Sequence, residues 1–394
     1  GSWDIPPRFD RLPLLSVIQM KMKRSLFLLC AVVPVLLSAT AFAAKPAKKQ
    51  QEAEKVENII LMIGDGMGLA HVTALMIENE YRPIQMERAP VTGFVKTHSA
   101  NNRVTDSAAA GTAFSTGRKT NNSRLGLDSA GNRLHTILEK ADARGMATGV
   151  VVTSGVVHAT PGAFFGHSMD RRKYKQVALG LLDTDIDVLI GSGRQYLEEG
   201  DPSIIGKLEK RGCLVVRSLE ELDDVSEGRA MALYPGDNYG IPTLAEGRSP
   251  EYLPRATAKA LEIVTNNSRG KGFFLMVEGS LIDKMCHAND AAGMLAEIRD
   301  FDNAVGVALD YAQAHPGTLV IILADHETGG LAIPSGNADF HLSESGIGYV
   351  WGSVSHTASM VPLFAYGPCA TRFGGVLEND EIGRRMQEVL GLQP

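Results

Sequence analysis

Short runs of apolar residues alternate along the chain with stretches in which apolar residues recur every three or four positions. The runs are typical of β-strands buried on both faces, and the periodic stretches are typical of helices. This alternation favours an α/β fold, in which helices cover both faces of a mostly parallel sheet. The predicted strands span residues 58–63, 148–153, 187–190, 273–277, 318–323 and 361–365. The predicted helices span residues 107–116, 132–144, 253–266 and 284–315.

The first 43 residues are expected to lie outside the folded domain. Lys21, Lys23 and Arg24 precede an apolar stretch at 26–37, and the tripeptide Ala-Phe-Ala follows at 41–43. This order predicts a secretory signal peptide over 20–43, too short in its apolar part to be a stable membrane span. Residues 1–19 precede the expected translation start and are interpreted as a non-native or misassigned leader. The protein is therefore expected to be periplasmic or secreted.

A polar linker at 44–57 precedes the predicted domain at 58–394. Residues 194–271 read as a segment inserted into that domain, with short elements around Leu214 and Met231. Removing five basic and two acidic residues with the first 43 changes the formal net charge from −6 to −9, which argues against a nucleic-acid-binding surface. Three cysteines, Cys213, Cys286 and Cys369, are too few for a disulfide scaffold, and the sequence leaves open whether any of them pair. It also leaves open whether the protein forms a homodimer.

Residues with metal-binding side chains follow three of the predicted strands. Asp65 comes after the strand at 58–63, Glu278 after 273–277, and Asp325 with His326 after 318–323. Ligand sites of open α/β sheets lie beyond the carboxyl ends of the strands. A single acidic residue after a strand usually belongs to a simple turn, but acidic residues after three strands indicate a ligand-binding site.

Two sets of these side chains have the composition of a catalytic zinc centre. Asp283 and His287 are four residues apart and share a face of the predicted helix, and His356 offers a second imidazole. One carboxylate and two imidazoles with an open position suit catalytic zinc. The second set, with two carboxylates and one imidazole, consists of Asp65, Asp325 and His326. Six other histidines are expected to be ordinary structural residues: His71, His98, His135, His167, His315 and His341.

A third set offers oxygen ligands. It consists of Glu278, the hydroxyl of Thr160 and the second carboxylate oxygen of Asp65. Oxygen-only coordination suits magnesium.

Ser107 lies where a serine hydroxyl can attack a phosphate. It follows Asp106 and begins a run of small residues that predicts a helix. The unpaired N–H groups and positive end of a helix N-terminus attract phosphate. Taken alone, Asp106 and Ser107 would be read as a helix cap. The three ligand sets favour Ser107 as a nucleophile instead.

Five motifs in this order resemble the alkaline phosphatase family. They are IGDGMG at 63–68, TDSAA at 105–109, VEGSLID at 277–283 with His287, ADHETGG at 324–330 and HTA at 356–358. The resemblance implies a single α/β/α sandwich around a large mixed, mostly parallel sheet, and hydrolysis of phosphate monoesters. It also implies two Zn²⁺ ions on the two mixed sets and one Mg²⁺ ion on the third.

The same resemblance assigns roles to the remaining residues. Ser107 is expected to form a phosphoserine, and Arg171, in HSMDR at 167–171, to hold the phosphate while Asp106 orients it. His158 stands two residues before Thr160, at a position where some family members have aspartate and others histidine. Lys284 follows Asp283, where the members with histidine at the first position more often have an aromatic residue or histidine. A nitrogen ligand from His158 would shift the third site from Mg²⁺ towards Zn²⁺.

Three other enzyme classes and one non-enzyme class are the alternatives to this function. A phosphodiesterase, a sulfatase or a phosphomutase of the same metalloenzyme superfamily is the nearest alternative. A sulfatase would need a Cys/Ser-x-Pro-x-Arg pattern, which is absent around Ser107. A phosphomutase would normally be cytoplasmic, which disagrees with the predicted signal peptide. A phosphodiesterase would gain little from Arg171, because a diester carries only one negative charge. The non-enzyme alternative is an extracytoplasmic protein that binds phosphate or metal. Small phosphate monoesters and inorganic phosphate are the expected ligands.

Overall fold

The computed structural model describes residues 55–200, 202–236, 238–248, 251–336 and 346–392. The predicted leader, the signal peptide, most of the polar linker and His341 lie outside these residues. Among the residues described, no helix is both long and apolar enough to cross a membrane. Cys213 and Cys286 are buried free thiols.

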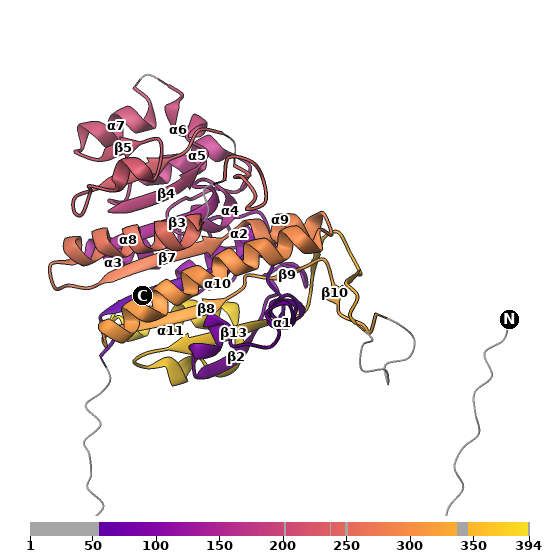
Figure 1. Cartoon of the computed structure of the whole chain (residues 1–394). Helices are drawn as coiled ribbons and strands as arrows, with labels where there is room; N and C mark the ends of the chain where they lie inside the picture. The colour runs from indigo at the N-terminus through magenta and orange to yellow at the C-terminus, as the bar shows by residue number, and fades with distance from the viewer. Residues whose placement is uncertain (1–54, 201, 237, 249–250, 337–345, 393–394) are drawn as a thin grey trace, which may run out of the picture. The chain divides into compact units, whose positions relative to one another are not determined.

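A mixed, mostly parallel sheet of ten strands forms the centre of the described part of the chain (Figure 1). Its strand order is β14-β2-β13-β8-β1-β7-β3-β4-β6-β5. Strand β13 is antiparallel to both of its neighbours, whereas β8, β1, β7, β3, β4, β6 and β5 run parallel to one another. The strands of this sheet are β1 Asn58–Gly64, β2 Val91–Lys96, β3 Ala147–Gly155, β4 Val188–Ser192, β5 Leu214–Val216, β6 Ala230–Leu233, β7 Phe273–Gly279, β8 Thr318–Leu323, β13 Val361–Tyr366 and β14 Gly375–Glu378.

Two small antiparallel ribbons lie apart from this sheet, β9 with β12 and β10 with β11. Their strands are β9 Glu327–Thr328, β10 Leu331–Ala332, β11 Val350–Trp351 and β12 His356–Thr357. The α-helices of the described residues are α1 Leu69–Glu78, α2 Ser107–Thr116, α3 Ile137–Ala143, α4 Ala159–Gly162, α5 Tyr174–Leu179, α6 Gln195–Glu198, α7 Ile204–Lys210, α8 Tyr252–Ser268, α9 Leu281–His287, α10 Ala291–Ala314 and α11 Asn379–Val389. Short 3₁₀ helices lie at Gln85–Arg88, Gly180–Leu182, Glu220–Leu222 and Ala370–Phe373.

Helices cover both faces of the sheet because the central strands are apolar on both faces. Every residue of β7 is buried. Its first two side chains point to opposite faces, since Phe273 packs against Tyr311 of α10 and Phe274 stacks on Phe164, just after α4. Helices α8 and α10 pack on each other, and α2 packs on α11. The α/β class and the layered architecture predicted from the sequence are confirmed.

The predicted strands lie within β1, β3, β4, β7, β8 and β13, except that β4 begins one residue later than predicted. The predicted helix at 107–116 coincides with α2. The helix predicted at 132–144 begins only at Ile137, after a capping box between Thr136 and Glu139. The single helix predicted at 284–315 is wrong, because α9 and α10 are separate helices. Asn289 has a left-handed backbone (φ 53°), and the Asp290 side chain caps α10 by accepting from the Gly293 N–H at 3.0 Å.

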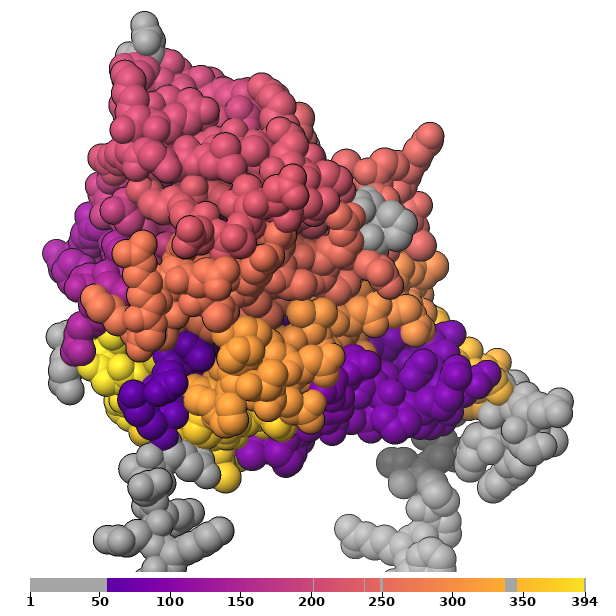
Figure 2. All heavy atoms as spheres, turned by 60° about the vertical axis from the view of Figure 1, so that its left-hand side comes forward, coloured from indigo at the N-terminus to yellow at the C-terminus, as the bar shows by residue number. Residues whose placement is uncertain are grey.

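Residues of the segment 194–271 continue the same sheet. Leu214 and Met231 lie on β5 and β6, which extend the sheet beyond β4. In the space-filling view this segment, pink to salmon, forms a surface continuous with the orange surface of α10 (Figure 2). Residues 52–394 group as one compact unit.

Candidate active site

Three buried carboxylates gather where β1, β7 and β8 end. These strands are neighbours in the sheet, and their parallel register brings the residues that follow them to one edge. Asp65, Glu278 and Asp325 are each 0% exposed. Both carboxylate oxygens of Asp65 and of Glu278, and Oδ2 of Asp325, have no hydrogen-bond partner. Buried carboxylate oxygens without partners are costly, so this cluster is suited to cations.

The first ligand group contains Asp65, Asp325 and His326. Asp325 Oδ1 accepts from the backbone N–H groups of Gly66 at 3.1 Å and His326 at 3.0 Å. Its Oδ2 lies 3.2 Å from His326 Nε2, and Asp65 Oδ1 lies 3.4 Å from the same nitrogen. The backbone thus holds one oxygen of Asp325 and leaves the other facing the imidazole.

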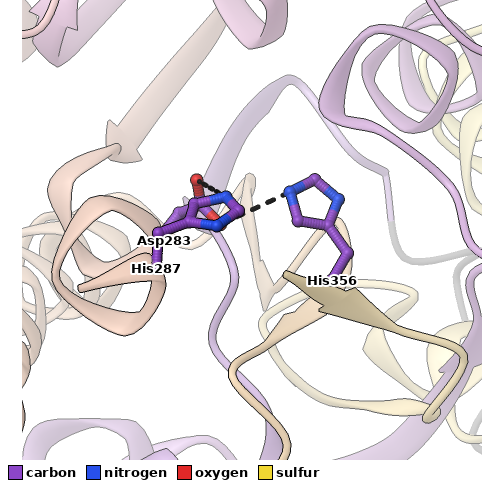
Figure 3. A group of neighbouring side chains, drawn as sticks. All are labelled: Asp283, His287 and His356. Carbon is purple, nitrogen blue, oxygen red and sulfur yellow. Dashed lines mark ion pairs between the residues drawn. The ribbon is translucent and has the colours of Figure 1, made fainter. Parts of the chain in front are cut away.

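The second group contains Asp283, His287 and His356 (Figure 3). Asp283 and His287 project from α9, whereas His356 comes from β12 and points towards them. The distance from Asp283 Oδ2 to His287 Nε2 is 3.2 Å, and from Asp283 Oδ1 to His356 Nε2 it is 3.6 Å. The His356 ring stacks on that of His326, with the centroids 3.5 Å apart, so the two groups adjoin.

These spacings fit zinc. Two ligands at about 2.1 Å from a tetrahedral zinc ion lie roughly 3.4 Å apart. The four nitrogen-to-oxygen distances within the two groups range from 3.2 to 3.6 Å. Both groups therefore have the donor types and the spacing that a zinc ion requires.

A third group shares Asp65 with the first. Asp65, Glu278 and His158 form it, and the buried Thr160 Oγ1, like His158 Nδ1, has no hydrogen-bond partner. His158 Nε2 lies 3.5 Å from Arg171 Nη2, which leaves Nδ1 as the nitrogen available for a metal. The group predicted as oxygen-only thus includes one nitrogen.

Ser107 is the first residue of α2 and faces the first group. Its Oγ lies 3.2 Å from His326 Nε2, and the residue is only 2% exposed. Asp106 caps the helix, because its Oδ1 accepts from Ala109 N–H at 3.0 Å, and its Oδ2 accepts from Ser123 N–H at 2.9 Å. The helix cap Asp106 and the predicted nucleophile Ser107 are therefore adjacent residues with separate contacts.

Two neighbouring arginines lie in different surroundings. Arg171 Nη1 lies 3.3 Å from Asp106 Oδ2, next to the cluster. The Arg172 side chain is 79% exposed and pairs with Asp170. Lys284 follows Asp283, and its ammonium group lies 5.4 Å from the centre of the Tyr239 ring, which belongs to the segment 194–271.

Burial dominates the acid–base properties of the carboxylates. Burial and the charges of Asp325 and Asp283 raise the pKa of Asp65 well above its usual value. Burial raises the pKa of Glu278 to about 8, and burial with the charge of Asp283 raises that of Asp325 to about 6. Burial alone would also raise the pKa of Asp283, but the hydrogen bond from His287 and the nearby histidines hold it below its usual value.

The pKa values of the histidines also depend on burial, hydrogen bonds and nearby charges. The hydrogen bond with Asp283 raises the pKa of His287 to about 9. Burial and His356 lower the pKa of His326 well below its usual value, and burial with the charge of Arg171 lowers that of His158 to about 3. The imidazoles of His326 and His158 are therefore neutral at pH 7, the form that binds metals.

Each histidine of the two zinc-type groups is oriented through its other ring nitrogen. Nδ1 of His287 lies 2.7 Å from the Val354 carbonyl oxygen, and Nδ1 of His356 lies 2.9 Å from that of Thr105. Nδ1 of His326 lies 3.1 Å from Thr328 Oγ1. In each case Nε2 faces the group. These partners could not be predicted from the sequence, because backbone carbonyls carry no sequence signal and Thr328 was identified only as part of the ADHETGG motif.

The comparisons with known proteins agree with this geometry. A sequence profile of the alkaline phosphatase family matches residues 56–346. Alkaline phosphatase 4 of Bacillus subtilis is 30% identical over 87% of this chain and 90% of that protein. The alkaline phosphatase of Escherichia coli is 30% identical over 89% of this chain and 87% of its own length. The structure of alkaline phosphatase from the Antarctic bacterium TAB5 matches with a TM-score of 0.80 and 32% identity, covering 86% of this chain and all of that one.

The family match covers most of the described domain, and these relatives extend over nearly the whole length of both chains. The chain is therefore an enzyme that belongs to the alkaline phosphatase family.

Proposed function

We propose that this enzyme hydrolyses phosphate monoesters through a phosphoserine on Ser107. The observation that carries the proposal is the position of Ser107 Oγ, 3.2 Å from His326 Nε2, at a helix N-terminus beside two groups with zinc-type spacing. Membership of the alkaline phosphatase family supports the same reaction. In that reaction Ser107 Oγ displaces the alcohol from phosphorus, and water then releases inorganic phosphate from the serine.

Asp65, Asp325 and His326 would hold one zinc ion, and Asp283, His287 and His356 the other. When bound, the two ions supply Lewis-acid stabilisation of the serine oxygen and of the leaving oxygen, and they lower the pKa of a water molecule. The buried, partnerless oxygens of Asp65 and Asp325 support this assignment.

Residues around Ser107 would position the phosphate. Apart from the Ala109 N–H, which donates to Asp106, the backbone N–H groups at the start of α2 would donate to a phosphate next to Ser107. The planar guanidinium of Arg171 can donate two parallel hydrogen bonds to non-bridging oxygens. Asp106, through its contact with Nη1, would hold that guanidinium in place.

The charge of the site favours a doubly negative substrate. The four carboxylates Asp65, Glu278, Asp283 and Asp325 carry four negative charges, and two zinc ions with one magnesium ion carry six positive ones. Arg171 and Asp106 cancel, which leaves two positive charges before Ser107 ionises. A monoester dianion balances this excess, whereas a diester, with one charge, does not.

The third group would hold magnesium, with zinc as the alternative. Glu278, Asp65 and Thr160 offer oxygen, but His158 adds nitrogen, which zinc accepts more readily. Two variants of the TAB5 enzyme, in which one histidine is replaced by glutamate or aspartate, have Mg bound in their M3 site. That finding supports a link between a histidine and the choice of metal.

We also propose that the enzyme is secreted or periplasmic, as the predicted signal peptide implies, and that it accepts a broad range of monoesters. A relative that is 31% identical over 91% of this chain is the streptomycin-6-phosphate phosphatase of Streptomyces griseus. The proposed contacts involve the phosphate and not the alcohol, so they leave the alcohol unrestricted.

The reaction is tested with the full-length mature enzyme loaded with zinc and magnesium. We expect release of phosphate from p-nitrophenyl phosphate and much slower cleavage of bis(p-nitrophenyl) phosphate. Ser107→Ala should lose on the order of 10³-fold or more in kcat while it keeps its zinc. Ser115→Ala is the matched control, because Ser115 lies on the same helix and donates to the Ala163 carbonyl at 2.7 Å.

Each alternative function has its own outcome. Faster cleavage of the diester would make the enzyme a phosphodiesterase. Binding of phosphate and zinc without turnover by the wild-type protein would favour the non-enzyme alternative. Full activity of Ser107→Ala would exclude the phosphoserine.

A further inference from the structure

Thr328 lies between the two groups proposed to hold zinc. Its Oγ1 is 2.5 Å from Asp283 Oδ1 and 3.1 Å from His326 Nδ1. Asp283 belongs to one group and His326 to the other. Thr328 is fully buried and lies on β9, directly opposite His356 on β12. One hydroxyl therefore contacts a ligand of each group.

The hydroxyl has a single proton, which sets the direction of both hydrogen bonds. A carboxylate that binds a metal is ionised and can only accept, so Thr328 must donate to Asp283. The oxygen of Thr328 is then free to accept the N–H of His326 Nδ1. This order leaves the lone pair of His326 on Nε2, which faces Asp65, Asp325 and Ser107.

The backbone of Thr328 is held from both sides. Its N–H donates to the Gly66 carbonyl at 3.1 Å, and its carbonyl lies 3.0 Å from His71 Nε2. Gly68 N–H donates to His71 Nδ1 at 3.0 Å, so the His71 proton must be on Nε2 and donate to Thr328. Gly66 and Gly68 follow Asp65 in the chain, which ties Thr328 to the first group through the backbone as well.

We infer that Thr328 is a positioning residue that joins the two metal groups through one ordered chain, from His326 Nδ1–H to Thr328 Oγ1–H to Asp283 Oδ1. The inference rests on the proposed function. Partners that orient metal ligands typically change metal affinity by about 10- to 100-fold. Because this partner is shared, its loss should weaken zinc binding at both groups.

The test compares Thr328→Val, which keeps the shape of threonine but has no hydroxyl, with Thr328→Ser, which keeps the hydroxyl. Metal-free protein is titrated with Zn²⁺ in competition with a coloured chelator. We expect Thr328→Val to bind the two zinc ions about 10- to 100-fold more weakly than wild type, and Thr328→Ser to remain near wild type. A long-range ¹H–¹⁵N spectrum of histidine-labelled, metal-free protein, with the His326 signals assigned by their loss in His326→Gln, should show the His326 ring protonated on Nδ1 in wild type and Thr328→Ser. The same ring should change its protonation pattern in Thr328→Val.

Thr357→Val is the matched control. Thr357 lies on the facing strand β12, and its hydroxyl donates to Glu327 and not to a ligand group. The Thr357→Val variant should bind zinc with the same affinity as wild type. If Thr328→Val fails to fold in the absence of metal, Thr328→Ala takes its place.

Two failures are distinguishable. A wild-type protein that neither binds zinc nor hydrolyses a monoester would contradict the proposed function itself. A wild-type protein that does both, with Thr328→Val and Thr357→Val indistinguishable from it in zinc affinity, would overturn only the role of Thr328. Equal losses in Thr328→Val and Thr328→Ser would also overturn it, because the hydroxyl would then not matter.

Discussion

Arg171 and Arg172 are adjacent in the chain but differ in their surroundings, which makes them a matched pair for mutation. We expect Arg171→Ala to lower kcat/KM for p-nitrophenyl phosphate by about 10²-fold, because hydrogen bonds between charged groups contribute roughly 1.5–3 kcal/mol. Inhibition by inorganic phosphate should weaken in parallel. Steady-state kinetics with added phosphate measures both effects.

Arg172→Ala should leave these constants unchanged, since its guanidinium is exposed and paired with Asp170. The assignment of the phosphate contact to Arg171 would be wrong if Arg172→Ala, and not Arg171→Ala, reduced kcat/KM.

His158 is the residue that distinguishes the third group from an all-oxygen magnesium site. In His158→Asp an oxygen replaces the nitrogen proposed to bind the third metal, so we expect the third site to prefer Mg²⁺ and activation by added Mg²⁺ to rise roughly tenfold. Metal analysis of dialysed protein, together with assays at graded Mg²⁺ concentrations, measures this preference. Identical third-site metal content in wild type and His158→Asp would contradict it.

Much of the site could be predicted because its residues belong to short motifs that follow strands. Asp65, Glu278 and Asp325 stand directly after apolar runs, and Asp283 with His287 has helical spacing. The residues that hold them could not be predicted in the same way. His71 has no local signal of its contact with the Thr328 carbonyl, 257 positions away, which only the folded sheet brings about.

The secondary-structure elements also include some that local sequence predicts and some that it does not. Buried parallel strands such as β1 and β8 are apolar on both faces and were predicted from the sequence. Strand β2 lies near the edge of the sheet, alternates buried and exposed residues and contains Gly93, so its signal is weak. The two-residue strands β9 and β12 form only because the chain returns to them from a distance, so no local pattern predicts them.

The break between α9 and α10 gives a prediction about an element boundary. We expect Asp290→Ala to lower the free energy of unfolding by about 1 kcal/mol, because the Gly293 N–H loses its side-chain cap. Hydrolysis of p-nitrophenyl phosphate should change little, since Asp290 lies outside the ligand groups. Urea unfolding of the zinc-loaded enzyme measures the loss.

Asp290→Asn is the control at the same position. Asparagine keeps a side-chain oxygen that can accept the Gly293 N–H, so this variant should be nearly as stable as wild type. A loss of stability in Asp290→Asn equal to that in Asp290→Ala would show that the cap is not the cause.

At the scale of the whole molecule, the fold collects acidic groups from distant parts of the chain and buries them at one edge of the sheet. Asp65, Glu278 and Asp325 come from three strands, and each is fully buried. Within the described part of the chain, these carboxylates have no counter-charge of equal size in the absence of metal, because Arg171 is a single cation that already pairs with Asp106. The domain is thus expected to depend on metal for stability as well as for catalysis.

This dependence should vary with pH in a defined direction. In the metal-free protein burial raises the pKa of Glu278 from its ordinary 4.5 to about 8, and the hydrogen bond with Asp283 raises that of His287 from 6.5 to about 9. A group with a raised folded-state pKa contributes stability that is complete below its ordinary pKa and is lost as the pH rises through the raised value. The free energy of unfolding of metal-free protein should therefore fall between pH 6.5 and 8.5, by roughly 2 kcal/mol from Glu278 alone.

Zinc- and magnesium-loaded protein should not show this fall, since a carboxylate that binds a cation carries no proton to lose. Urea unfolding of EDTA-treated and metal-loaded protein at pH 6.5, 7.5 and 8.5 measures the difference. Glu278→Gln measures the contribution of this one carboxylate, because the amide does not titrate. The metal-free form of this variant should lose less stability over the same pH range. Parallel pH curves for metal-free and metal-loaded wild type would mean that the buried carboxylates do not bind the metals that restore activity.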